Sequence, residues 1–522
     1  MADSTVVYIV LGGVVVLFVS NVVPVEIVAI ATALALWATG VLEIEEALAG
    51  FGDPTVIFIA TLFVVSEALD ATGITTWAGQ KLIAGAGESR VRLIVLTMLL
   101  CGVLTAVISV NGAVAALIPV AVVTAMRAQQ APSRLLLPLA FGAHAGSMLA
   151  LTGTPVNVIV SEAAHDAGSD YFGFFEFTII GIPLLAGTVA IVVLLGDKLL
   201  PVRPPRRSSR DFSQHCRVLV RQYEIDESLS GKLFDRRTGV AEVVIPPRSA
   251  IIGDVAFPGM VTESGELVVL AVQRKGQVLG PSEVTLAAGD SLLLRGTWDA
   301  LETNLDDPDV LVVDAPGDVR RQTVAFGPGA WTTTAVVAVM VVLLATAVVP
   351  PAVAGLLAAC ALVLMRVVTV EQAYRSISWT TVVLVAGMIP LSTAMRVSGA
   401  AEQLADGLVD LVGDAGPYAL LVGLFLLTAV MGQLISNTAT ALIVIPIAVS
   451  AAAELDVSVR PVLMSLTVAA AAALLTPVAT PANMMVMGPG GYRFGDYAKL
   501  GLPVLVWFFV VSVGIVPLIW QF

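Results

Sequence analysis

The sequence predicts an all-α polytopic membrane protein made of two inverted repeats, with an α+β domain inserted between them. Three observations lead to this fold class. The 522-residue chain is 57% hydrophobic and only 13% charged, whereas charged residues make up about 25% of a soluble protein. Most of the chain must therefore lie in lipid. The charges gather in one internal segment, and the apolar runs on its two sides follow the same order.

Seven apolar runs precede the charged segment and seven follow it, and we predict membrane-buried helices for them. The first run has no basic residues before it and has a counterpart in the second half, so we expect a retained helix and not a signal peptide. The runs are 5–23, 25–42, 54–73, 91–109, 112–126, 135–160 and 178–199, then 331–349, 351–367, 380–397, 418–435, 438–453, 461–484 and 500–520.

Residues 203–326 have the composition of a soluble domain, with 33 charges in 124 residues against 34 in the other 398. We therefore divide the chain into a first membrane repeat at 1–202, an inserted domain at 203–326 and a second membrane repeat at 327–522. Short apolar strands separated by turn residues predict a β-rich α+β fold for the insert. The strands are expected at 216–220, 240–245, 267–272 and 291–295.

The two membrane halves align with a shift of 326 residues, which indicates an internal duplication. The shift pairs Asn111 with Asn437 without a gap. Other matched segments lie along the whole length of the halves. They are Val22-Val23-Pro24 with Val348-Val349-Pro350, Thr154-Pro155 with Thr480-Pro481, and Gly181-Ile182-Pro183 with Gly501-Leu502-Pro503 at a shift of 320.

The distribution of basic residues predicts the orientation in the membrane. With the N-terminus outside, ten Lys and Arg residues of the membrane halves fall inside, and only Arg396 and Arg460 fall outside. The insert is then cytoplasmic, and both termini lie outside the plasma (inner) membrane of a prokaryote. Each half has an odd number of crossings, so the halves are inverted, as in many secondary transporters. The ten inside residues are Lys81, Arg90, Arg92, Arg127, Arg134, Lys198, Arg366, Arg375, Arg493 and Lys499.

The segments 91–126 and 418–453 are either two full spans or one re-entrant hairpin each. Loop charges do not distinguish these alternatives, because both return the chain to its starting side. We favour hairpins because the second arms are about 15 residues long and contain Pro119 and Pro446, whereas a span needs about 20 residues.

Two kinds of polar interruption occur once in each half. The hairpin tips are Ser109-Val110-Asn111-Gly112 and Ser436-Asn437-Thr438, and the later helices are broken at 152–157 and 476–483. Polar backbone in lipid is tolerated only beside a cavity or other protein. Free N–H groups attract an anion, whereas carbonyl, Asn and Ser/Thr oxygens suit a cation such as Na⁺. Simple helix capping is the alternative for each segment, but four symmetric segments favour a binding site.

The segment 435–441 followed by Pro446 resembles the Ser-Asn-Thr hairpin of the divalent anion:sodium symporter family. The second break and the following Gly488-Pro489-Gly490-Gly491-Tyr492 resemble the same family, and the similarity covers both membrane halves. The resemblance implies that tips and breaks meet at mid-membrane and bind sulfate or a di- or tricarboxylate between sodium ions. It also implies that one domain moves against a scaffold like an elevator.

Carried over to this sequence, the resemblance implies two sets of site residues. The substrate-binding residues would be Asn111, Gly112, Thr154, Ser436, Asn437, Thr438, Thr476, Pro477 and Thr480. The candidate Na⁺ ligands would be Ser109, Asn111, Ala150, Asn437 and Ala479. The first tip departs from the family pattern, since Val110-Asn111-Gly112 stands where the symmetrical pattern has Ser-Asn-Thr. We therefore expect a weaker first anion contact and a weaker first sodium site.

Residues 208–312, including Gly239-Val240-Ala241-Glu242 and Ala288-Gly289-Asp290, resemble the TrkA-C domain of potassium-channel regulators. The resemblance implies a regulatory domain that forms a homodimer and binds a small ligand such as a nucleotide. The segment has no G-x-G-x-x-G fingerprint, so the sequence itself does not identify a dinucleotide.

We therefore expect a secondary active symporter that moves a small divalent anion with Na⁺ and is controlled by its inserted domain. A cation/proton antiporter of the same superfamily and a proton-coupled anion transporter are the alternatives. The sequence shows no nucleophile–base or metal constellation, so neither an enzyme nor a bound cofactor is expected. A net charge of −13 excludes the polybasic surface that a nucleic-acid partner requires. We expect His144 to be a core or capping residue rather than a proton carrier.

The orientation predicts different labelling of two single-cysteine variants in whole cells. In a background without Cys101, Cys216 and Cys360, Ser169→Cys should react with a membrane-impermeant thiol reagent and Ser264→Cys should not. Cells permeabilised with detergent provide the control, because both variants should then react. Labelling of Ser264→Cys but not Ser169→Cys in intact cells would reverse the predicted orientation.

Overall fold

The computed structural model divides the chain into two compact units, and each is described by itself. The helical unit comprises Met1–Leu69, Ala78–Ser208 and Thr332–Phe522, and the second unit comprises Asp70–Trp77 and Ser209–Trp331. The structure describes residues 3–20, 22–75, 77–78, 81, 89–128, 130–203, 223, 238–280, 282–305, 307–314, 327, 329–412 and 416–522.

In the first half of the helical unit, the predicted apolar runs form helices, and the long run at 135–160 is broken. The elements are α1 (Asp3–Ser20), α2 (Val25–Ala38), α3 (Ile44–Leu48), η1 (Ala49–Gly52), α4 (Pro54–Ala71), α6 (Arg90–Val107), α7 (Val110–Arg127), η2 (Pro132–Arg134), α8 (Leu136–Gly146), η3 (Ser147–Leu149), η4 (Leu151–Gly153), α9 (Pro155–Asp166) and α10 (Glu176–Leu199).

In the second half the predicted apolar runs also form helices, and the long run at 461–484 is broken. The elements are α15 (Ala330–Thr346), α16 (Pro351–Leu364), α17 (Val370–Ser376), α18 (Trp379–Val397), α19 (Ala400–Val412), α20 (Pro417–Leu434), α21 (Asn437–Glu454), α22 (Val459–Ala471), α23 (Pro481–Gly490), α24 (Phe494–Val510), η8 (Val511–Ile515) and α25 (Val516–Ile519).

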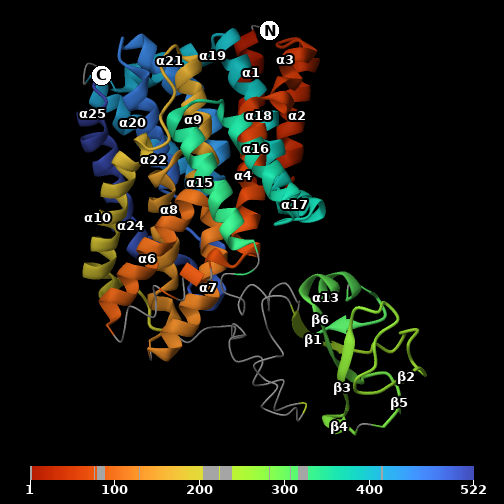
Figure 1. Cartoon of the computed structure of the whole chain (residues 1–522). Helices are drawn as coiled ribbons and strands as arrows, with labels where there is room; N and C mark the ends of the chain where they lie inside the picture. Colours follow the sequence, from red (N-terminus) through yellow and green to blue (C-terminus); the bar gives the residue numbers. More distant parts are fainter. Residues whose placement is uncertain are drawn as a thin grey trace. The chain divides into compact units, whose positions relative to one another are not determined.

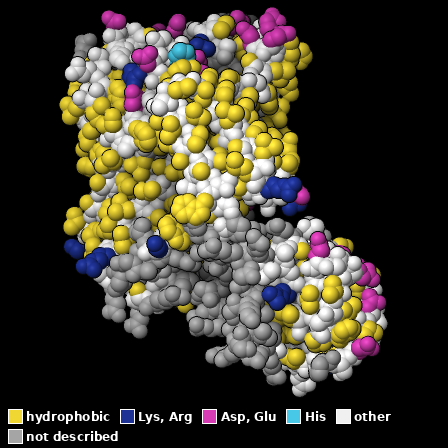
Figure 2. All heavy atoms as spheres, viewed as in Figure 1, with side chains coloured by type: hydrophobic (Ala, Val, Ile, Leu, Met, Phe, Trp, Pro, Cys, Tyr) yellow, Lys and Arg dark blue, Asp and Glu magenta, His cyan; other side chains and the backbone are white. Residues whose placement is uncertain are grey.

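Eight helices of the described residues are long and apolar enough to cross a membrane, as expected for a polytopic membrane protein. Their outward side chains are hydrophobic, as Ile9, Val16, Val103 and Leu194 illustrate. On the face of the helical unit shown in Figure 2, hydrophobic side chains cover the middle, Asp and Glu gather near one end, and Lys and Arg near the other. Both chain termini lie at one end of this unit (Figure 1).

The second arms of the two hairpins are longer than predicted. Both α7 and α21 contain 18 residues, not about 15. The helices extend past the apolar runs because a serine caps each start and because polar residues such as Glu454 continue the last turn. The α6–α7 hairpin and the α20–α21 hairpin lie toward opposite ends of the helical unit (Figure 1).

Two groups of packed helices, each with helices of both halves, can be distinguished in the helical unit. In one group α2 of the first half packs along α18 of the second, with α1 against both. In the other group α6 packs on α8, α10 packs on α24, and α22 packs on α20 and α21. Figure 1 shows α2 beside α18, and α10 beside α24.

The second unit contains an antiparallel five-stranded sheet of order β4-β3-β6-β1-β7 and a two-stranded sheet of β2 and β5. Three of the predicted strands are present, and the predicted strand at 216–220 lies outside the described residues. Trp298 and Leu301 of α13 belong to the buried core of the larger sheet. The elements are β1 (Thr238–Val244), β2 (Val255–Ala256), β3 (Val268–Arg274), β4 (Gln277–Leu279), β5 (Val284–Thr285), β6 (Ser291–Thr297), α13 (Trp298–Asn304) and β7 (Leu311–Val312).

An ion pair fixes the turn before β6 in this unit. The guanidinium of Arg274 donates from Nε and Nη2 to the two carboxylate oxygens of Asp290, each at 2.7 Å. These hydrogen bonds lower the pKa of the fully buried Asp290 below its usual range. The Asp-containing turn identified in the sequence is therefore held by strand β3.

Two repeat-related glycines let the last long helix of each half approach the broken helix. A Cβ on Gly181 of α10 would overlap the carbonyl oxygen of Met148, and a Cβ on Gly501 of α24 would overlap that of Leu474. Met148 and Leu474 are themselves related by the shift of 326. The paired Gly-x-Pro segments of the sequence therefore mark a close contact between helix and backbone in both halves.

We predict that Gly501→Val destabilises the helical unit, because the added side chain must push α24 away from the second break. Overpacking of this kind costs about 1–3 kcal/mol. Gly495→Ala on the same helix is the matched control, since no atom lies within 4 Å of its Cβ position. Thermal unfolding in detergent should show a lower midpoint for Gly501→Val only. Equal midpoints would mean that the close approach is not needed.

Candidate functional site

Each hairpin tip is a two-residue turn that ends in a serine cap. Ser109 Oγ accepts a hydrogen bond from Gly112 N–H at 3.2 Å, and Ser436 Oγ accepts one from Ala439 N–H at 3.3 Å. The capping alternative is therefore observed for both hydroxyls. The caps fix where α7 and α21 begin, and so they decide which side chains stand at the tips.

The caps pair the two tips differently from the sequence alignment. Ser109 corresponds to Ser436, so Val110 takes the first helical position that Asn437 takes in the other half. Asn111 then corresponds to Thr438, one residue away from its partner in the ungapped alignment. The caps therefore offset the two asparagines by one helical position, although the ungapped alignment of the sequence pairs them.

The two asparagines also differ in their surroundings. The Asn111 side chain is exposed, whereas Asn437 is half-buried and its Oδ1 is buried without a hydrogen-bond partner among the described residues. A Cβ on Gly432 would have only this Oδ1 within 4.0 Å. The amide oxygen of Asn437 therefore faces the last turn of α20, beside a residue without a side chain.

The breaks in the two long helices are closed by one asparagine each. Asn157 Nδ2 donates to the carbonyl oxygens of Ser147 and Ala150, at 2.9 and 2.8 Å. Asn483 Nδ2 donates to those of Ala473 and Thr476, at 2.8 and 3.0 Å. In each half the two carbonyls precede the asparagine by ten and seven residues. The amide hydrogens are thereby committed, and both Oδ1 atoms must act as acceptors.

His144 of α8 joins the second break to the first half. Its Nε2 lies 3.1 Å from Asn483 Oδ1 and 3.3 Å from Thr480 Oγ1. Because Oδ1 can only accept, Nε2 carries the proton that it donates. In the first break Asn157 Oδ1 is buried without a partner among the described residues, and Ala470 stands where the shift of 326 would place a histidine. The expectation of a core or capping role for His144 agrees with these contacts.

Each tip is tied to the break of its own half. In the second half Gln433 Oε1 accepts from Leu475 N–H at 2.9 Å, and its Nε2 donates to the Ala472 carbonyl at 3.0 Å. In the first half Thr152 Oγ1 donates to the Ala106 carbonyl, the last turn of α6, at 2.7 Å. Gln433 was not among the predicted site residues, because a glutamine at a helix end carries no spacing signal.

The broken helices of the two halves cross. The first piece of one packs against the last piece of the other, α8 on α23 and α22 on α9. The second hairpin arms complete the arrangement, since α7 packs against α23 and α21 against α9. The structure therefore gathers each tip, its own break and the broken helix of the other half. No hydrogen bond of the described residues joins Asn111 to Asn437.

The remaining predicted residues line the breaks. Thr480 caps α23 by accepting from Asn483 N–H at 3.3 Å, and Thr476 Oγ1 accepts from Ala479 N–H at 3.2 Å. Pro477 and Ala479 are buried, and Thr154 is half-buried at the start of α9. The Ala150 carbonyl accepts from Asn157 Nδ2 at 2.8 Å and from Gly153 N–H at 3.1 Å, so both of its lone pairs are used.

Among the residues that the structure describes, no group of three or more His, Cys, Asp or Glu side chains could hold a metal ion. A cation at the tips and breaks would therefore be held by amide, hydroxyl and carbonyl oxygens. Neutral oxygens of this kind suit Na⁺ in transporters with broken helices.

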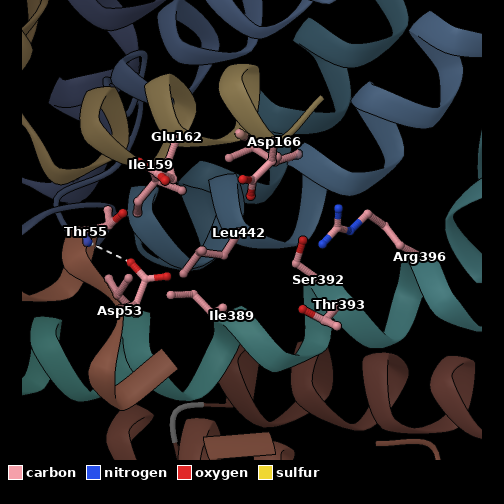
Figure 3. Close-up of a pocket in the computed structure, with 13 residues that line it drawn as sticks. Asp53, Thr55, Ile159, Glu162, Asp166, Ile389, Ser392, Thr393, Arg396 and Leu442 are labelled. Carbon is pink, nitrogen blue, oxygen red and sulfur yellow. Dashed lines mark hydrogen bonds between the residues drawn. The ribbon is translucent and has the colours of Figure 1, made fainter. Parts of the chain in front are cut away.

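A cavity of about 90 Å³ lies away from the tips, between α4, α9, α18 and α21. Figure 3 shows Asp53 and Thr55 at the start of α4, Glu162 and Asp166 on α9, and Ser392, Thr393 and Arg396 on α18. Asp53 Oδ1 accepts from Thr55 N–H at 2.7 Å. Of these residues the sequence singled out only Arg396, as a basic residue outside the membrane, because their meeting depends on packing between the halves.

Comparison with known proteins agrees with this architecture. The family model described as CitMHS, citrate transporter, matches residues 15–468 and 411–522. An uncharacterized transporter of Escherichia coli (strain K12), YfbS, is 31% identical over 97% of this chain and 98% of its own length. A probable sodium/sulfate cotransporter 3 of Chlamydomonas reinhardtii is 25% identical over 56% of this chain and 33% of its own. The crystal structure of the YdaH transporter of Alcanivorax borkumensis is similar in fold, with a TM-score of 0.50 and 13% sequence identity. The match covers 90% of this chain and 86% of the YdaH chain.

The hydrogen bonds at the breaks predict that the two closing asparagines contribute unequally to stability. Asn483→Ala would remove the donor to the Ala473 and Thr476 carbonyls and the 3.1 Å acceptor of His144, which would keep only Thr480. Asn157→Ala would remove the donor to the Ser147 carbonyl and an oxygen that has no partner among the described residues, while the Ala150 carbonyl would keep Gly153 N–H. Each buried group left without a hydrogen bond costs about 1–3 kcal/mol. Thermal unfolding should therefore show the larger loss for Asn483→Ala. An equal or smaller loss would contradict the bond between Asn483 and His144.

Proposed function

Because the chain belongs to the citrate transporter family, and is thus an integral membrane transporter rather than an enzyme, we propose that it is a Na⁺-coupled symporter of a small divalent anion. The substrate class is sulfate or a di- or tricarboxylate. This is also the class implied by the resemblance of the second hairpin to divalent anion:sodium symporters. The inner membrane of a prokaryote is the proposed location.

The observation that carries this proposal is the asymmetry of charge at the second tip. The last turn of α20 presents the negative end of an 18-residue helix, and the first turn of α21 presents the positive end of another. Asn437 stands between them, with its buried Oδ1 toward Gly432. A cation on the α20 side and an anion on the α21 side would each meet the favourable helix end.

The relatives support the two ions separately. The family model is described as a citrate transporter, and relatives from Chlamydomonas reinhardtii are named sodium/sulfate cotransporters. Sulfate and citrate are both oxygen-rich polyanions, and free N–H groups of helix starts bind either.

We further propose an elevator motion, in which the helices that carry the tips and breaks move against the others. The supporting observation is the division of packing inside the helical unit. Helices α1, α2 and α18 pack on each other, α6, α8, α10 and α24 form a second continuous group with the broken helices, and α18 meets the tip helix α21. Because both halves contribute to both groups, a sliding motion would carry the whole site.

The alternatives predict different chemistry at the site. A cation/proton antiporter or a proton-coupled transporter needs a titratable group in the transport path. The described tip and break residues are amides, hydroxyls and backbone groups, and the imidazole His144 among them donates to Asn483. Coupling to Na⁺ is therefore favoured over coupling to protons.

The second unit is proposed as a regulatory domain of the TrkA-C type, which forms a homodimer and binds a small ligand. The supporting observation in the helical unit is the attachment of the segment that leads to the insert. Arg203 Nη1 binds Asp496 Oδ2 at 2.6 Å and the Gly491 carbonyl at 3.2 Å. Tyr497, next to Asp496, donates to the Asn483 carbonyl at 2.6 Å. A change at the insert could thus reach the second break.

We predict that Asn437→Ala abolishes anion transport while the protein still folds, because the tip loses the oxygen placed between the two helix ends. Uptake of labelled sulfate, succinate and citrate into proteoliposomes, with and without an inward Na⁺ gradient, measures the effect. Wild-type protein should accumulate one of these anions only with the gradient.

Asn111→Ala is the matched control, since Asn111 is exposed and stands one residue farther along its helix. It should reduce transport less than Asn437→Ala. Uptake by Asn437→Ala at the wild-type rate would place the site elsewhere, and uptake without a Na⁺ gradient would refute sodium coupling.

A further inference from the structure

A second buried oxygen lies one helical turn after Asn437. Thr440 of α21 is 0% exposed, and its Oγ1 has no hydrogen-bond partner among the described residues. Residues three apart on a helix lie on one face, so the hydroxyl of Thr440 and the amide of Asn437 share a side of α21. Neither of these two oxygens has a hydrogen-bond partner among the described residues.

The buried hydroxyls of Thr55, Thr97 and Thr428 also have no partner among the described residues, but of these four only Thr440 lies one turn from a second such oxygen on its own helix, Asn437 Oδ1. Four other buried threonines satisfy their hydroxyls within their own helix. Thr32, Thr105, Thr188 and Thr467 each donate to the carbonyl four residues earlier, at 2.7 to 2.8 Å. This is the usual way for a helical threonine to be satisfied in an apolar setting. The equivalent carbonyl for Thr440 belongs to Ser436 and accepts only the Thr440 backbone N–H, at 2.9 Å. The Thr440 side chain thus faces away from its own helix backbone.

Two unpartnered oxygens on one buried helix face cost about 1–3 kcal/mol each. Such a cost is expected where a ligand binds and satisfies both atoms. The neighbouring turn of α20 offers room for a small ligand, because the position of a Cβ on Gly432 has only Asn437 Oδ1 within 4.0 Å. The same turn is the negative end of α20, which favours a cation over an anion.

We propose that Thr440 Oγ1 and Asn437 Oδ1 together bind the coupling Na⁺ at the second hairpin, with Thr440 as a cation ligand that the Ser-Asn-Thr pattern does not include. The inference rests on the proposed function and names the residue that sets the sodium affinity of the same site. Hydroxyl and amide oxygens are hard, neutral ligands that suit a monovalent cation in a buried site. The anion then occupies the α21 side of the tip, where Ser436 and Thr438 stand.

The test uses the purified full-length protein in detergent, without any anion substrate. Thermal unfolding is followed during a titration with NaCl, with choline chloride holding the ionic strength constant. A ligand that binds the folded state alone raises the unfolding midpoint as its concentration rises. Wild-type protein should be stabilised by Na⁺ and not by choline.

Thr440→Val removes the hydroxyl and keeps the side-chain shape. We expect the Na⁺ concentration for half-maximal stabilisation to rise about tenfold, which corresponds to about 1.4 kcal/mol of binding free energy. Thr440→Ser should keep the wild-type value, because it keeps the oxygen. Thr467→Val is the matched control, since Thr467 is equally buried and its hydroxyl is satisfied by Leu463.

Gly432→Val tests the same site from helix α20, in case Thr440→Val fails to fold. Its side chain would fill the room beside Asn437 Oδ1, and the Na⁺ requirement should again rise. Wild-type sodium dependence in both Thr440→Val and Gly432→Val would overturn the proposal, as would the absence of any Na⁺ stabilisation in the wild-type protein.

Anion uptake by the same variants separates this inference from the proposed function. Na⁺ stabilisation that Thr440→Val weakens, in a protein that takes up no anion, would support the cation site and refute the symport. Na⁺-driven uptake with an unchanged sodium requirement in Thr440→Val would support the symport and refute the role of Thr440.

Discussion

A carbonyl group inside a membrane protein must find a hydrogen-bond donor, since lipid supplies none. The helical runs at 135–160 and 461–484 are each interrupted, and each interruption frees carbonyls that a continuous helix would satisfy. One asparagine in each half, Asn157 or Asn483, returns from the following helix and donates to two of them. The rest of the central architecture depends on this closure, because it holds the polar backbone in a fixed shape between packed helices.

The two halves differ around this shared feature. In the second half the closing asparagine is satisfied on both sides, because His144 donates to its oxygen, and Gln433 fastens the hairpin to the break. In the first half the corresponding oxygen has no partner among the described residues, and Val110 stands at the first helical position of the tip. The second half is thus the better preorganised one, and the proposed cation site lies there.

Much of the fold could be predicted from the sequence, because local signals determine it. The apolar run at 380–397 became α18 (Trp379–Val397), and the predicted strand at 267–272 became β3 (Val268–Arg274). Long hydrophobic runs and turn residues act through neighbouring positions, so their effect survives in the folded chain. The breaks were equally predictable, since proline and polar residues interrupt a helix wherever it packs.

The details of the site could not be predicted in the same way. The alignment paired Asn111 with Asn437, but a cap at Ser109 starts α7 one residue early and separates them. The contacts of His144 with Asn483 and Thr480 join residues more than 330 positions apart, and no local pattern encodes such a meeting. The 90 Å³ cavity with Asp53, Glu162 and Arg396 arises for the same reason, from packing between the halves.

The neutrality of the tips and breaks has a consequence for coupling. Desolvation of a divalent anion in a site without fixed charge costs much free energy. The free N–H groups of a helix start offset this cost only in part. A cation at the proposed site beside Asn437 would lower that cost, and by thermodynamic linkage the anion would strengthen cation binding by the same factor. A fixed lysine or arginine in the site would attract the anion in the absence of sodium and so weaken the coupling. Amides and hydroxyls instead make each ion depend on the other, which is the property that a symporter requires.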